Sequence, residues 1–111
     1  MVSLPVDQRD ALSVLARLFL THGFPERAVR LYGALNVLDP QDPQHLRGLS
    51  LALARADRLD ESLATLDRLA LGGHMDEGFH VLRADVLARL DRHEESATAM
   101  RAYLTLKESA S

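Results

Sequence analysis

The sequence has no cysteine and no tryptophan, and aromatic residues make up only 5% of its 111 residues. Without cysteine the chain can form neither disulfides nor thiolate metal sites, and it has no cysteine nucleophile. Its apolar residues are mostly leucine and alanine, which favour helices over sheets because β-branched and aromatic residues are scarce. The formal net charge of −3 gives no reason to expect a nucleic acid as partner.

Long apolar runs are absent as well. No stretch approaches the ~20 residues that a helix needs to cross a bilayer. Met1–Asp7 has no basic segment followed by an apolar run, so we expect neither a signal peptide nor membrane insertion. The hydrophobic share of 47% and the charged share of 26% are ordinary for a soluble globular protein. We therefore expect one cytoplasmic domain over residues 1–111.

One short stretch of the sequence occurs twice. Ala54–Ser62 and Ala88–Ser96 are identical at six of nine positions, and the same step backwards from Ala54 reaches the similar arrangement Leu20–Ala28. The step equals the period of about 34 residues that is typical of the tetratricopeptide repeat, which the sequence resembles. The resemblance implies an all-α fold, a right-handed superhelix of three tetratricopeptide (TPR) helix-turn-helix repeats. These repeats would span approximately residues 9–42, 43–76 and 77–110.

Apolar residues recur with helical spacing in the first two repeats. Asp7 is a candidate N-cap of the first helix, Gly23 ends that helix, and Leu38-Asp39-Pro40 ends the second. Ser62 is a small residue that lets two helices approach closely. The predicted core residues are Leu12, Leu15, Ala16, Phe19, Ala28, Val29, Tyr32, Leu35, Leu46, Leu49, Leu53, Leu63, Leu66 and Leu69.

The third repeat is the least regular. His80 and Arg83 occupy positions expected to be buried, and they compete with an apolar stripe of Phe79, Leu82, Val86 and Leu90. We expect the first helix of this repeat to be rotated by about one residue; the alternative is a terminal repeat altered to act as a cap. The second helix is expected to bury Ala97, Met100, Tyr103 and Leu104.

No motif in the sequence indicates catalysis, whether a phosphate-binding glycine-rich loop, His-Glu-x-x-His or Gly-x-Ser-x-Gly. The five histidines are expected to be ordinary turn or surface residues, and the acidic pairs at 60–61 and 94–95 complement the dipoles of the helices they open. We expect no enzymatic activity, no cofactor and no metal. An enzyme or regulator that uses His80, Arg83 and Asp85 as a polar cluster is the alternative.

The first helix of each pair lines the inner groove of such superhelices, so its non-core residues face any bound peptide. Four arginines interleaved with leucine, alanine and valine would form an amphipathic trough for a peptide with apolar anchors and acidic groups. Alternatively, Arg55 and Arg89 are structural and bridge to acids on the next repeat. The predicted partner-binding residues are Arg17, Leu20, Arg47, Leu51, Ala54, Arg55, Val81, Asp85 and Arg89.

Leu31–Pro40, followed by Gln41–Leu49, and the ending Tyr103–Lys107 resemble the TPR chaperones of bacterial type III secretion. The chain is most similar to the small YscY (SctY) chaperones over nearly its whole length. This resemblance implies a cytosolic bacterial chaperone that binds a small export substrate, YscX (SctX), and engages the export-gate protein of the injectisome. It would be a heterodimer with its client and a homodimer when free. The alternatives are a translocator chaperone of the SycD/LcrH class and a generic TPR scaffold or dimerisation module.

Overall fold

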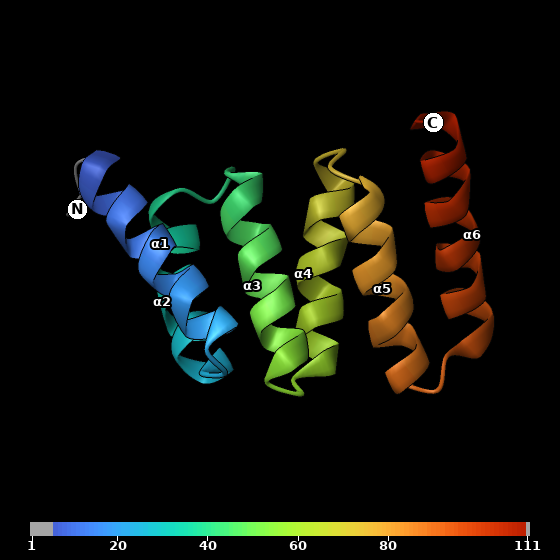
Figure 1. Cartoon of the computed structure of the whole chain (residues 1–111), viewed down its shortest axis with the longest axis horizontal. Helices are drawn as coiled ribbons and strands as arrows, with labels where there is room; N and C mark the ends of the chain where they lie inside the picture. Colours follow the sequence, from blue (N-terminus) through green and yellow to red (C-terminus); the bar gives the residue numbers. More distant parts are fainter. Residues whose placement is uncertain (1–5, 111) are drawn as a thin grey trace.

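Residues 6–110, the part of the chain that the computed structural model describes, form six helices in three pairs (Figure 1). The helices are α1 (Val6–Thr21), α2 (Pro25–Leu38), α3 (Pro43–Arg55), α4 (Leu59–Leu71), α5 (Glu77–Arg89) and α6 (His93–Ala110). No strand occurs in these residues. The prediction of an all-α superhelix of helix-turn-helix repeats is confirmed.

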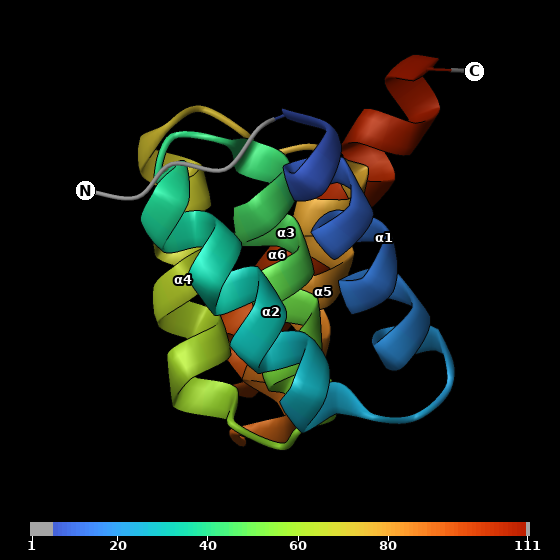
Figure 2. The ribbon, with the colours of Figure 1, turned by 90° about the vertical axis from the view of Figure 1, so that its left-hand side faces the viewer.

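The six helices lie in two layers. The first helices of the pairs, α1, α3 and α5, contact one another in turn, whereas α2, α4 and α6 contact only first helices. Viewed from the N-terminal end, α1 lies on one side of the stack, and α2 and α4 lie on the other (Figure 2). The stack measures 43 × 28 × 25 Å. None of the described helices is long and apolar enough to cross a membrane.

The turns within the pairs recur with the same period as the sequence repeat. Gly23, Asp57 and Asp91 follow the first helices with φ angles of 83°, 62° and 61°, the left-handed conformation that commonly ends a helix. The amide after each of them donates to a carbonyl of the preceding helix at 2.8–2.9 Å. All three pairs therefore turn in the same way, with aspartate replacing glycine in the second and third.

The N-terminal caps of α3 and α5 are also one repeat apart. A carboxylate oxygen of Asp42 accepts a hydrogen bond from the amide of Gln44, and one of Asp76 accepts from the amide of Phe79, each at 2.9 Å. The predicted cap of the first helix is wrong, because α1 already begins at Val6 and Asp7 lies inside its first turn.

Ser62 and Ser96 bring the two helices of a pair close together. The hydroxyl of Ser62, which is fully buried, donates to the carbonyl of Ser50 at 2.8 Å. One repeat later the hydroxyl of Ser96 donates to the carbonyl of Ala84 at 2.7 Å. The close approach predicted at Ser62 is confirmed, and a hydrogen bond between the helices satisfies each hydroxyl.

Most of the core predicted for the first two repeats is buried or packed against buried residues. The exception is Leu15, which is 40% exposed. α3 and α5 each pack one face against the preceding second helix. No described helix precedes α1, so the equivalent face of α1 is open. The predicted residues in the buried clusters include Ala16, Ala28, Val29, Tyr32, Leu35, Leu46, Leu53, Leu63, Leu66 and Leu69.

The helix α5 is not rotated relative to α3. It buries Phe79, Ala84, Val86 and Leu87. At the equivalent positions one repeat earlier, α3 buries His45, Ser50, Ala52 and Leu53. The apolar stripe through Phe79 and Val86 does pack in the core, but the predicted rotation is wrong because this stripe lies on the face that α3 also buries.

The helix α6 buries less of its surface than predicted. Ala97 is exposed, Met100 and Leu104 are 41% and 48% exposed, and Tyr103 is half-buried. The buried residue of α6 is Ala99. Since α4 is covered by α3 and by α5, whereas α6 contacts α5 alone, no described helix covers the outer side of α6. The prediction of a buried face there is therefore wrong.

Candidate binding trough

Two hollows lie between neighbouring first helices. The larger, of about 560 Å³, is bounded by Arg47, Leu51, Val81 and Asp85 of α3 and α5. The smaller, of about 270 Å³, lies between α1 and α3 and includes Arg17 and Leu20. Because Arg47 and Leu51 line both hollows, the two form one continuous trough, which we call the inner trough.

The two hollows occupy equivalent positions in successive repeats. Tyr32 and Gln44 line the smaller hollow, and their equivalents in the next repeat, Leu66 and Gly78, line the larger one. A leucine takes less space than a tyrosine, and Gly78 has no side chain. Both exchanges favour a larger volume between α3 and α5, whereas the exchange of Gly48 for Leu82 acts against it.

The inner trough includes most of the predicted partner-binding residues. Leu20 contributes little surface, since it is only 7% exposed, whereas Val81 is 40% exposed. Ala54 is 2% exposed and packs with Leu63 and Val86 in the core, so it offers no surface to a partner. The predicted residues that line the trough are Arg17, Leu20, Arg47, Leu51, Val81 and Asp85.

Arg55 and Arg89 connect successive first helices. The guanidinium of Arg89 donates to the carbonyl of Ala54 at 3.0 Å and to the carboxylate of Asp57 at 2.8 Å. One repeat earlier, Arg55 donates to the carbonyl of Leu20 at 3.4 Å. Carbonyls near a helix C-terminus lack intrahelical donors and attract cations. The structural role is therefore confirmed, but the predicted direction is wrong, because both arginines reach the preceding repeat and only Arg89 binds an acid there.

Arg47 lies at the centre of the inner trough with an acid as partner. Its guanidinium is 2.6 Å from a carboxylate oxygen of Asp76, whose other oxygen caps α5. The Nε atom of Arg47 is buried without a hydrogen-bond partner. Arg17 is exposed, and no ion pair to it occurs among the described residues. The trough is thus less basic than four arginines would suggest.

The sequence did not indicate that the floor of the larger hollow is a binding surface. Leu66 and Leu69 reach it from α4, and Phe79 and Leu82 from α5. Their helical spacing marks them as core residues, and they are also largely buried. The one available signal was Gly78, which replaces Gln44 of the preceding repeat and leaves the hollow open beside them.

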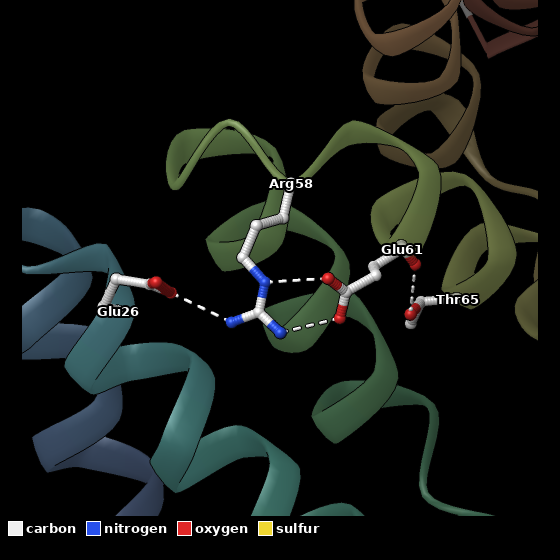
Figure 3. Close-up of polar contacts among 4 residues, drawn as sticks. All are labelled: Glu26, Arg58, Glu61 and Thr65. Carbon is white, nitrogen blue, oxygen red and sulfur yellow. Dashed lines mark hydrogen bonds and ion pairs between the residues drawn. The ribbon is translucent and has the colours of Figure 1, made fainter.

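Polar clusters outside the trough stabilise the turns. Arg58 lies between α3 and α4, and Figure 3 shows its guanidinium between Glu26 and Glu61. It donates two hydrogen bonds to Glu61, at 2.9 and 2.7 Å, and one to Glu26 at 3.0 Å. These bonds lower the pKa of Glu61, and bonds from Arg92 likewise lower the pKa of Glu95. Both glutamates are therefore bound to arginines at the starts of their helices.

The turn between α2 and α3 brings Asp39, Asp42 and His45 together, with ligand-type atoms within 4.8 Å of one another. Asp42 caps α3, and Asp39 lies 3.9 Å from the guanidinium of Arg9. His45 is buried, at 6% exposure, rather than a surface residue as expected. We assign these side chains to the structure of the turn.

The polar cluster considered as an alternative site is not assembled in the trough. Asp85 lines the larger hollow and pairs with Arg89 at 3.6 Å, whereas His80 and Arg83 line neither hollow. Burial lowers the pKa of His80, and the charge of Arg83 lowers it further. The neutral form of His80 is therefore favoured, and the ring packs edge-on against Phe79.

A stack of helix pairs with a trough along its first helices defines the class of helical repeat proteins that present an extended concave surface. The family model described as "Tetratricopeptide repeat" matches residues 14–78, more than half of the sequence, and the chain belongs to this family. No curated protein matches the sequence. Tetratricopeptide repeats generally mediate protein–protein interactions, so this is a protein-interaction module.

Proposed function

We propose that the inner trough binds a segment of a partner protein and takes one large apolar side chain into the larger hollow. The observation that supports this most directly is the apolar floor of Leu66, Leu69 and Phe79, which remains open toward Leu51 and Val81. An open apolar hollow with a few polar groups at its edge is typical of a side-chain pocket. Arg47 and Asp76, paired at that edge, would orient the partner's backbone.

The charges along the trough suggest a direction for the bound segment. Arg17 lies at the α1 end, and Asp85, with a half-exposed carboxylate, lies at the α5 end. A segment with an acidic residue near α1 and a basic residue near α5 would complement both. The apolar anchor between them would supply most of the affinity, because exposed ion pairs contribute little.

We further propose that the partner is an unfolded export substrate, as the resemblance to the YscY chaperones implies. The chain would then be a cytoplasmic bacterial chaperone that binds a YscX-like client and delivers it to the export apparatus. A chaperone of this kind shields apolar client segments, which suits an apolar hollow. A translocator chaperone of the SycD/LcrH class and a general TPR scaffold are the competing proposals, and the identity of the client separates all three.

We also propose that the chain is not an enzyme. In support, the buried hydroxyl of Ser62 donates to a backbone carbonyl, as does that of Ser96, and neither lines the inner trough. Turnover of the bound client, measured by mass spectrometry of the purified complex over time, would contradict this.

Substitutions in the trough test the binding site. The chain is co-expressed with the product of the adjacent gene, the expected client, and the affinity of the purified pair is measured by isothermal titration calorimetry. We expect Leu51→Glu and Val81→Glu to weaken binding at least tenfold, about 1.4 kcal/mol, because each places a charge beside the apolar hollow.

The matched control is Leu71→Glu, which adds the same charge at an 89% exposed leucine of α4, outside the trough. It should bind as the wild type does, and circular dichroism should show all three variants folded. Wild-type affinity in both trough variants would refute the site. Failure of the adjacent gene product to bind, with another client bound in the trough, would refute only the type III assignment.

A further inference from the structure

Each first helix packs on the second helix before it through one set of positions. In α5, Phe79, Leu82 and Val86 lie against Leu63, Leu66 and Leu69 of α4. In α3, the equivalent positions of the preceding repeat include Gly48 and Ala52, which lie against α2. These positions form the apolar contact between successive repeats.

The same positions in α1 are apolar and uncovered. One further repeat towards the N-terminus, the equivalents of Gly48 and Ala52 are Val14 and Leu18, and Leu15 is the equivalent of the packed Leu49. Val14, Leu15 and Leu18 are 54%, 40% and 48% exposed. With the exposed Ala11, they make up what we call the α1 end face.

The opposite end of the stack carries the other half of this contact. Leu63, Leu66 and Ala70 of α4 pack toward α5, and their equivalents in α6 are Ala97, Met100 and Leu104. These three residues, which we call the α6 end face, are all exposed. The two end faces lie at opposite ends of the row of helices, and no described helix lies beyond either of them (Figure 1).

We propose that copies of this chain stack head to tail, with the α1 end face of one copy on the α6 end face of the next. The new contact would repeat the packing of α5 on α4, because each end face carries the residue positions that form one half of that contact. Since every copy carries both end faces, a second copy can supply the missing half of the contact at either end. The contact is heterologous and leaves one face open at each end, so it produces short linear arrays rather than a closed dimer. A small interface of this kind gives weak, concentration-dependent association.

Complementation between two blocked variants tests this arrangement. Leu15→Glu blocks the α1 end face, and Met100→Glu blocks the α6 end face. Both residues are exposed, so neither substitution removes core packing. Sedimentation velocity over a concentration series should show that the average mass of the wild type rises beyond two chains. Each variant alone should remain monomeric, and an equimolar mixture should form a species of two chains and no larger one.

The control is Val37→Glu, at an 80% exposed valine of α2 away from both end faces, which should associate like the wild type. Circular dichroism confirms that each variant is folded. A wild type that stays monomeric up to its solubility limit overturns the proposal, as does a mixture that contains only monomers. A Leu15→Glu variant that dimerises by itself overturns it too, because that result indicates a symmetric dimer through α6. None of these outcomes depends on a client in the inner trough.

Discussion

Gly48 and Tyr32 show how the inner surface depends on single residues. A Cβ atom added at Gly48 would lie 2.2 Å from Cε1 of the Tyr32 ring and 2.4 Å from its Cζ. One repeat later, the same two positions hold Leu82 and Leu66, two side chains of equal size. A large residue paired with glycine and two residues of medium size are alternative solutions for one helix contact.

Gly48→Ala should therefore lower the free energy of unfolding by about 1–3 kcal/mol, the usual cost of overpacking. Gly33→Ala is the matched control, because its added Cβ meets nothing within 4 Å. Alanine in a helix interior is favoured over glycine by about 0.5–1 kcal/mol, so the control should be stabilised. Urea denaturation measures both. An unchanged stability for Gly48→Ala would show that the ring moves aside at no cost, and Tyr32→Leu should rescue the variant if the ring is the obstacle.

At the scale of the single helix, α4 and α6 begin with the same kind of ion pair. Arg58 binds Glu61, and Arg92 binds Glu95, each three residues further along the chain. The acid complements the positive end of the helix dipole, and the arginine just before the helix fixes its carboxylate. The arginine and glutamate of the repeated motif thus have a structural role at the helix starts.

The loss of stability at acidic pH should report on these two arginine–glutamate pairs. The pKa of Glu61 is lowered from its ordinary value of 4.5, and the pKa of Glu95 is lowered as well. A carboxyl group whose pKa is lower in the folded state than in the unfolded state stabilises the folded state at pH values above its ordinary pKa. This contribution is lost as the pH falls through the pKa of the folded state.

The double variant Glu61→Gln/Glu95→Gln should melt below the wild type at neutral pH, and the two melting temperatures should converge as the pH falls below 4.5. The difference should be modest, because exposed pairs are screened by solvent. Thermal melts of both proteins from pH 7 to pH 3 measure it. A constant difference across this range would contradict the assignment.

At the scale of the whole molecule, the protein is a short one-dimensional stack in which each repeat contacts only its neighbours. Its apolar clusters lie between adjacent helices, but the inner trough and the two end faces are left open. We expect such a stack to have modest stability by itself, because α6 contacts α5 alone and one apolar face of α1 is exposed. Ligands that cover the open surfaces should stabilise it.

Client binding should therefore raise the melting temperature. At a free client concentration one hundred times the Kd, linkage predicts about 2.7 kcal/mol of stabilisation. This corresponds to a rise of roughly 10 °C for a domain of this size. Differential scanning calorimetry with the candidate client measures the shift, and Val81→Glu should abolish most of it. An unchanged melting curve at saturating client would count against binding to the folded state.

Local sequence signals were sufficient to predict the helices. The glycine and proline positions and the spacing of leucines are properties of neighbouring residues, and they placed the turn at Gly23 and the end of α2 at Leu38. These features depend on helix geometry, which the chain satisfies locally. The predicted trough residues along α1, α3 and α5 followed from the resemblance to tetratricopeptide repeats, in which the first helix of each pair lines the groove.

The contacts between repeats could be assigned only from the tertiary structure. Arg55 and Arg89 looked like trough residues, yet their guanidinium groups bind carbonyls of the preceding repeat, at Leu20 and Ala54. Met100 matched a core position, yet it is exposed because no described helix covers α6 on its outer side. Whether an arginine is paired, or an apolar face covered, depends on partners distant in sequence, and a helical period carries no information about them.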